Sequence, residues 1–165
     1  MTLAKNRVGV ELVNYYDIPE ADIGEDRYAP LTGAYAIIRV EDRFLLGYNK
    51  RRQQWEFPAG KIEVGEHPRE AAIRELYEET HQKVDNLQFY GLFQIYDNRK
   101  KEYRFRALYY GELDVLAEFD GEQNEEMEKI MLWNGKDDVG YIDEVDLKMV
   151  EIGIVSCGLC YSGIK

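Results

Sequence analysis

Short runs of alternating apolar and polar residues predict that strands make up most of this chain. Residues 34–40 and 43–48 have the pattern of a hairpin with a tight turn between its arms. Longer runs at 87–96 and 103–110 predict a second hairpin around a polar loop. Residues 14–32 are polar and contain two prolines, which favours a loop. Further strands are predicted at 7–13, 55–58 and 129–133.

Two segments have the spacing of helices instead. The first is predicted over about 68–81, with Pro68 at the first helical position, where its missing N–H costs nothing. The second is predicted over about 143–156, where apolar residues recur at helical intervals. Strands and helices that mix without strict alternation predict an α+β fold with one mixed sheet. No linker or repeat interrupts the chain, so we expect a single domain over residues 1–165.

The charge balance limits the function. The chain carries 21 Lys and Arg against 32 Asp and Glu, a formal net charge of −11. This argues against binding of a nucleic acid polymer, because affinity for phosphate backbones rests on basic residues. No apolar run reaches the ~18 residues of a membrane span, and the start lacks the pattern of a signal peptide. We therefore expect a cytoplasmic protein without a membrane partner. Cys157 and Cys160 are too few for a disulfide framework.

Three carboxylates lie on one face of the first predicted helix. Glu75, Glu78 and Glu79 stand at i, i+3 and i+4, a spacing at which like charges repel. A solvated acidic face would explain them, and so would a hard divalent cation such as Mg²⁺ or Mn²⁺. The preceding loop favours the cation, because its glycines let the backbone turn sharply beside the helix start. An acidic protein that binds a phosphorylated molecule also needs a cation, because the two negative charges would otherwise repel each other.

The order of residues 60–79 resembles the Nudix box, the signature of hydrolases that act on nucleoside diphosphates linked to another group. The matching residues are Gly60, Glu66, Arg74, Glu75, Leu76, Glu78 and Glu79. The chain departs at the last two positions of the pattern, where the family has Gly and an aliphatic residue. Here they are His81 and Gln82. The family glycine closes the helix in a left-handed conformation, which His adopts more readily than most non-glycine residues.

The resemblance implies a Nudix fold, in which a mixed sheet lies between helices. It also implies that Mg²⁺ or Mn²⁺ is held by Glu75, Glu78 and Glu79 with the carbonyl of Ala59. Arg74 would orient Glu75, because a planar guanidinium fixes a carboxylate well. The candidate catalytic residues are therefore Glu75, Glu78 and Arg74.

The attacking base stays open at this stage. Glu75 and Glu78 are candidates, and so is a glutamate from a later acidic loop, since Nudix hydrolases often supply one from there. In this chain that residue would be Glu125 or Glu126. Gly60 and Glu66 are expected to anchor the loop that precedes the box helix, the predicted helix over about 68–81 that carries Glu75, Glu78 and Glu79.

The implied reaction is hydrolysis of a pyrophosphate bond in a nucleoside diphosphate derivative. The stretch 56–66 is similar to that of MutT-type enzymes, which favours a nucleoside triphosphate, oxidised ones included, cleaved to monophosphate and pyrophosphate. ADP-ribose or a nucleotide sugar is the alternative substrate. A nucleotide-binding regulator without catalysis is a second alternative, although regulators tend to lose the carboxylates that this chain keeps. The expected partner is a small nucleotide, and a homodimer is compatible with the sequence.

One basic stretch, 99–106, stands out in the acidic chain. Arg104 and Arg106 alternate with aromatic residues, so both project from one face of the predicted strand. Together with Arg52 they are candidates for contact with substrate phosphates. The alternative is an edge strand that its charges keep soluble.

Overall fold

The computed structural model of the chain describes residues 1–156. Cys157 and Cys160 lie outside the described residues. Within that part of the chain, no helix combines the length and the apolar character that crossing a membrane requires.

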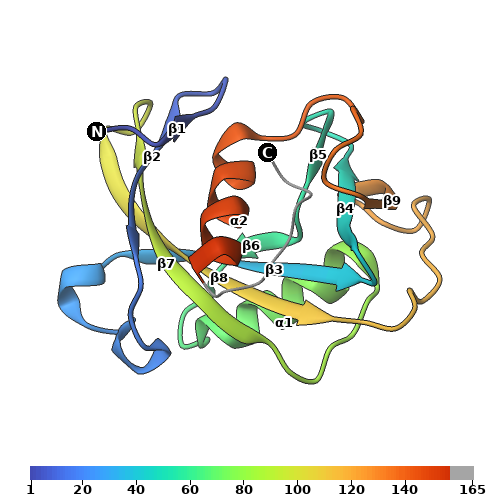
Figure 1. Cartoon of the computed structure of the whole chain (residues 1–165), viewed down its shortest axis with the longest axis horizontal. Coiled ribbons are helices and arrows are strands. Elements are labelled where there is room, and N and C mark those ends of the chain that lie inside the picture. The colour runs from blue at the N-terminus through green and yellow to red at the C-terminus, as the bar shows by residue number, and fades with distance from the viewer. Residues whose placement is uncertain (157–165) are drawn as a thin grey trace.

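The strands of the described residues form one mixed sheet (Figure 1). They are β1 (Ala4–Lys5), β2 (Val10–Tyr16), β3 (Leu31–Val40), β4 (Arg43–Asn49), β5 (Gln54–Glu56), β6 (Ala59–Lys61), β7 (Gln88–Asp97), β8 (Glu102–Glu112) and β9 (Met127–Trp133). Their order is β1-β2-β7-β8-β3-β4-β5, while β6 pairs with β3 and β9 pairs with β4. Only β3 and β8 run parallel, and the other pairs are antiparallel. The mixed sheet of an α+β fold is thereby confirmed.

The two helices, α1 (Pro68–Thr80) and α2 (Glu144–Ser156), cover opposite faces of the sheet (Figure 1). Side chains alternate between two cores along β3, as the pleat of a strand requires. Tyr35 and Ile37 pack in the core under α2, whereas Ala36 and Ile38 pack in the core under α1. The α1 side is rich in buried alanines, which let this helix approach the sheet closely. They are Ala34, Ala36, Ala71, Ala72 and Ala107.

Both predicted hairpins are confirmed. Val40 pairs with Arg43 across the turn between β3 and β4, and Asp97 pairs with Glu102 across the turn between β7 and β8. The second helix begins as expected after Asp143. The Oδ1 atom of this residue accepts hydrogen bonds from the N–H groups of Val145 at 2.9 Å and Asp146 at 3.1 Å.

The N-terminal part differs from expectation. The strand predicted at 7–13 begins only at Val10, and Val8 is exposed. It also continues to Tyr16, because residues 14–16 pair with β7, a partner 80 residues away that local pattern does not reveal. The predicted loop is correspondingly shorter. It contains two short 3₁₀ turns, η1 (Glu20–Asp22) and η2 (Asp26–Tyr28).

The edge-strand interpretation of the basic stretch is wrong. Strand β8 carries Arg104 and Arg106 and lies inside the sheet, paired with β7 on one side and β3 on the other. Its charges therefore do not protect an open edge. They face side chains of neighbouring elements instead.

Candidate active site

The start of the box helix α1 is fixed by side chains. Pro68 is the first helical residue, as predicted, and His67 precedes it with an extended backbone. The Nδ1 atom of His67 accepts a hydrogen bond from the N–H of Arg69 at 3.1 Å, and Glu70 Oε1 accepts one from the N–H of His67 at 3.0 Å. These bonds satisfy N–H groups that have no partner inside the helix.

The helix ends at His81, which has the left-handed conformation (φ 60°, ψ 15°) that glycine has in the family pattern. Its ring stacks on Tyr77 and meets Phe119 edge-on, each with 5.6 Å between ring centres. Gln82 is buried, and its amide group bonds both the N–H of Ala117 at 2.7 Å and the carbonyl of Ala117 at 2.9 Å. The two departures from the Nudix pattern thus tie the helix end to the loop after β8.

Arg74 clamps the loop and the carboxylates together. Its Nε and Nη2 atoms donate to the two oxygens of Glu66 at 2.8 and 3.0 Å, and Nη2 also donates to the carbonyl of Lys61 at 2.9 Å. Nη1 donates to Glu75 at 2.8 Å and to Glu78 at 3.2 Å. The bonds from Arg74 lower the pKa of Glu66. These contacts agree with the proposed anchoring role of Glu66.

Two other carboxylates meet the backbone of β6. A Cβ atom at Gly60 would overlap the carboxyl group of Glu75, so only glycine leaves room for this side chain. Glu79 is buried, and its Oε1 atom accepts a hydrogen bond from the N–H of Ala59 at 2.8 Å. The structure therefore brings the box carboxylates, Gly60 and Ala59 together.

Negative charge is concentrated and partly desolvated at this place. Burial raises the pKa of Glu79 well above its usual value, and the charges of Glu126, Glu75 and Glu56 raise it further. Burial also raises the pKa of Glu75, although Arg74 opposes the effect. A bound cation would stabilise the ionised form of carboxylates that are crowded and partly desolvated in this way.

Of the two loop candidates, Glu126 has a clear electrostatic effect on the box helix: its negative charge raises the pKa values of both Glu75 and Glu79. The carboxylate of Glu126 is exposed and forms no hydrogen bond or ion pair with the described residues.

Arg52 lies beside the same acidic cluster. Its Nη1 atom donates to both oxygens of Glu56 at 3.0 and 2.9 Å. Glu56 also accepts from Asn49 at 3.0 Å and from Gln54 at 2.6 Å, so its carboxylate is held from three sides. The charges of Glu56, Glu126 and Glu79 raise the pKa of Arg52. The Arg52 side chain is half-exposed, and its contact with a substrate phosphate stays a prediction.

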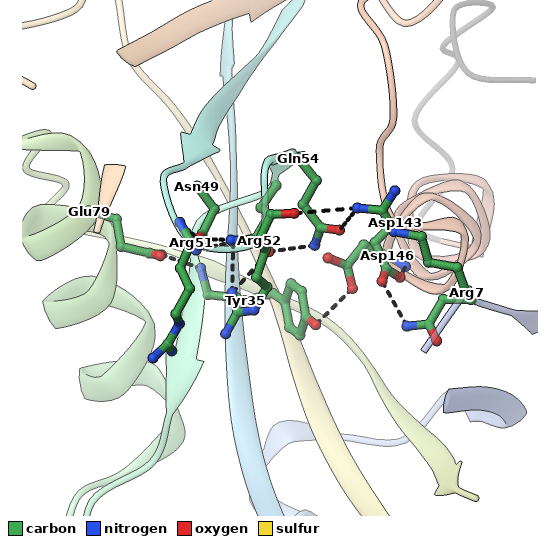
Figure 2. Close-up of polar contacts among 12 residues, drawn as sticks. Arg7, Tyr35, Asn49, Arg51, Arg52, Gln54, Glu79, Asp143 and Asp146 are labelled. Atoms are coloured by element: carbon green, nitrogen blue, oxygen red, sulfur yellow. Dashed lines mark hydrogen bonds and ion pairs between the residues drawn. The ribbon is translucent and has the colours of Figure 1, made fainter. Parts of the chain in front are cut away.

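Figure 2 shows that polar side chains continue from Glu79 on α1 towards Asp143 and Asp146 at the start of α2. At the α2 end, the Tyr35 hydroxyl donates to Asp146 at 2.8 Å and accepts from Arg106 at 3.0 Å. Arg106 also lies 3.8 Å from Asp146. Burial raises the pKa of Asp146 to about 7.

Arg104 and Arg106 on β8 form their ion pairs away from the box glutamates. Arg104 donates to the buried carboxylate of Asp97 at 2.9 Å, and Arg106 contacts Tyr35 and Asp146. Among the described residues, no ion pair connects either arginine to Glu75, Glu78 or Glu79. Phosphate contact by Arg104 and Arg106 stays a prediction.

The donor groups suit a hard divalent cation, which prefers carboxylate and carbonyl oxygens. In the described part of the chain, no three acidic, His or Cys side chains already converge on one point. Glu75 and Glu79 are held instead by Arg74 and by the N–H of Ala59. The raised pKa values of these two neighbouring carboxylates are the observation that fits a cation here.

Sequence reasoning missed several residues of this region. Glu56 and Gln54 alternate with Trp55 and Phe57, a signal that a polar strand face enters the site. Asn49, Tyr35 and Asp146 gave no comparable signal. They are brought together only by the pairing of strands and by the packing of α2.

The model of the NUDIX domain family matches residues 29–150. The chain belongs to the Nudix family. Among curated relatives, the chain is 32% identical over 82 residues to the putative 8-oxo-dGTP diphosphatase YtkD of Bacillus subtilis. That match covers 50% of each chain. The chain is 44% identical over 47 residues to an RNA pyrophosphohydrolase of Francisella philomiragia, covering 28% of this chain and 30% of that protein. The matches thus span half or less of these relatives.

Solved structures agree with the fold. A mutant of the Bacillus subtilis pyrophosphohydrolase BsRppH superimposes with a TM-score of 0.70 over 94% of both chains at 17% identity. The NUDIX domain of Shewanella oneidensis NrtR, complexed with ADP ribose, gives a TM-score of 0.64 at 16% identity. That match covers 85% of this chain and 99% of the other. At such identities the likeness shows the fold alone.

Proposed function

We propose that this protein is a divalent-metal-dependent hydrolase that cleaves a pyrophosphate bond in a nucleoside diphosphate derivative. The observation that carries the proposal is the pair Glu75 and Glu79: Glu75 is half-buried against Gly60, and Glu79 is buried and accepts a hydrogen bond from the N–H of Ala59. A solvated acidic face would not bury Glu79 or require a glycine opposite Glu75.

Glu75 and Glu79, with Glu78 and the carbonyl of Ala59, would hold Mg²⁺ or Mn²⁺. When bound, such an ion neutralises charge on the phosphate oxygens and lowers the pKa of the attacking water. Arg74 keeps Glu75 oriented and opposes the rise in its pKa. The carboxylate of Glu126 forms no hydrogen bond or ion pair with the described residues, and it serves as the base. Water attacks phosphorus, its proton passes to Glu126, and the bond to the bridging oxygen breaks.

The substrate that we favour is a nucleoside triphosphate, oxidised ones included, which yields monophosphate and pyrophosphate. The similarity to a putative 8-oxo-dGTP diphosphatase supports this choice. Several other curated relatives are named RNA pyrophosphohydrolases, so a triphosphate at an RNA 5′ end is the second candidate. The net charge of −11 favours the free nucleotide, because contact with further phosphates of a polymer needs basic side chains. A cytoplasmic location and a homodimer stay predictions.

A hydrolysis screen with Mg²⁺ or Mn²⁺ tests the proposal. It should include GTP, 8-oxo-dGTP, ADP-ribose and a 5′-triphosphorylated RNA oligonucleotide, with products separated by anion exchange. We expect monophosphate and pyrophosphate from a nucleoside triphosphate, and loss of turnover on chelation that added Mg²⁺ reverses. Turnover that survives full chelation would contradict the metal mechanism. Tight nucleotide binding without turnover of any substrate would favour the regulator.

A further inference from the structure

The loop that carries Glu126 has no regular secondary structure of its own. It runs between β8 and β9, and residues 113–126 contain neither helix nor strand. A carboxylate on such a segment acts on a fixed site only if other contacts hold the backbone. The question is what fixes Glu126 relative to Glu75 and Glu79.

Asn124 provides a direct connection to the box helix. Its Nδ2 atom donates to the carbonyl of Glu78 at 2.8 Å. This carbonyl belongs to the last turn of α1, where carbonyl groups have no partner within the helix. The bond therefore joins the loop to the turn that separates the Glu75 and Glu79 side chains.

The same side chain also fixes the backbone of Glu126. Asn124 Oδ1 accepts hydrogen bonds from the N–H of Glu126 at 3.0 Å and from the N–H of Met127 at 2.7 Å. The carbonyl of Glu126 accepts from the N–H of Lys50 at 2.9 Å. Both backbone groups of Glu126 are thus held, and Asn124 is buried while Glu126 itself is exposed.

Two further contacts hold the rest of the loop without reaching the box carboxylates. Gln82 bonds both backbone groups of Ala117. The ammonium group of Lys50 donates to the carbonyl of Gly121 at 2.8 Å and also to the carbonyl of Asn124. Removing Asn124 alone would therefore leave the loop attached but free Glu126 from the helix.

We propose that Asn124 is a positioning residue that fixes the backbone of Glu126 against the last turn of the box helix, so that the Glu126 carboxylate can act together with Glu75 and Glu79. The bond from Asn124 to the Glu78 carbonyl and the bond from the Glu126 N–H to Asn124 carry this inference. The inference rests on the proposed function in that it assigns Glu126 a part in the metal-dependent reaction. It predicts that Asn124 acts only through Glu126.

A double-mutant cycle tests this dependence. Asn124→Ala, Glu126→Gln and the combination should each lower kcat by roughly 10–100-fold with little change in KM, and the combination should be no worse than Glu126→Gln alone. Asp120→Ala is the matched control. Its carboxylate accepts a bond from the N–H of Glu122 in the same loop at 3.0 Å, and no hydrogen bond or ion pair joins it to the described residues of α1. Multiplicative losses in the combination, or wild-type kcat in folded Asn124→Ala, would overturn the proposal.

Mn²⁺ binding, followed by electron paramagnetic resonance in the absence of nucleotide, gives a readout apart from turnover. Asn124→Ala should weaken Mn²⁺ binding by the same factor as Glu126→Gln, and Asp120→Ala should not. If the wild type binds Mn²⁺ without hydrolysing any nucleotide, the proposed function fails while this comparison still decides the role of Asn124. Should Asn124→Ala fail to fold, Asn124→Asp keeps the acceptor for Glu126 and Met127 and replaces the donor to Glu78 with a carboxylate oxygen, which the Glu78 carbonyl repels. An Mn²⁺ affinity that falls in Glu126→Gln but keeps its wild-type value in that variant would equally overturn the proposal.

Discussion

Gly60 and Glu75 are packed so closely that a Cβ atom built on Gly60 would lie 2.0 Å from the carboxyl carbon of Glu75. Gly60 does not have a positive φ, so its backbone would accept another residue. The glycine is needed for space alone. It lets a carboxylate of the box helix lie directly against the backbone of β6.

We therefore expect Gly60→Ala to affect activity more than stability. The new methyl group displaces the end of a flexible side chain, which costs about 1 kcal/mol, at the low end of overpacking, but it moves Glu75 away from its place beside Gly60 and Arg74. The kcat should fall by about 10²-fold or more. Thermal melts and steady-state kinetics measure the two effects.

Gly65→Ala provides the contrast for that experiment. Gly65 has φ +80° and open space around its Cβ position. Alanine there should lower the free energy of unfolding by about 1–2 kcal/mol. A Gly60→Ala variant with wild-type kcat would show that the position of Glu75 is not critical.

Glu79→Gln should separate the charge of this residue from its shape. Glutamine still accepts the hydrogen bond from the N–H of Ala59, so the fold should survive. Removal of a buried charge near Glu126, Glu75 and Glu56 should raise the melting temperature of the metal-free protein. The kcat should fall by about 10²-fold or more, because the cation loses a charged ligand. Near-normal turnover at saturating Mg²⁺ would show that Glu79 is not a ligand, and the exposed Glu122→Gln serves as control.

His81 offers a test of how the box helix ends. His81→Gly relieves the left-handed conformation but loses the ring contacts with Tyr77 and Phe119, each worth about 0.5–1.5 kcal/mol. The net change in the free energy of unfolding should therefore be within about 1 kcal/mol. His81→Ala loses the contacts and keeps the strain, so it should be less stable than His81→Gly by about 1 kcal/mol. Equal stability of the two variants in urea melts would contradict this.

The parts of the site that sequence predicted are those that local chemistry determines. Pro68 marks the helix start, and the spacing of Glu75, Glu78 and Glu79 places them on one helical face. The contact of Arg74 with Glu75 was implied by the resemblance to the Nudix box, and these two residues are neighbours in sequence.

The parts that sequence could not predict depend on contacts between distant segments. Asn124 and Glu78 are 46 residues apart, and Tyr35 and Asp146 are 111 residues apart. Strand alternation placed Arg106 on one face of its strand but could not reveal that Tyr35 and Asp146 are its neighbours there. Helix α2 packs over that face and supplies Asp146. Only the pairing of β8 with β3 and the docking of α2 create this contact.

The buried carboxyl group of Asp146 predicts a pH dependence of stability. Tyr35 and Arg106 contact it, while the charges of Asp143 and Glu56 oppose its ionisation, and its pKa rises from 3.8 to about 7. Between these values the folded protein binds more protons than the unfolded chain, so stability falls as pH rises from about 4 to about 7.

Asp146→Asn cannot ionise. It should match the wild type near pH 4 and exceed it at pH 8 by up to about 4 kcal/mol, the size of the full pKa shift. Urea unfolding at a series of pH values measures the difference, with the exposed Asp114→Asn as control. If the wild type and Asp146→Asn show parallel profiles from pH 4 to pH 8, Asp146 is ionised throughout and the prediction is wrong.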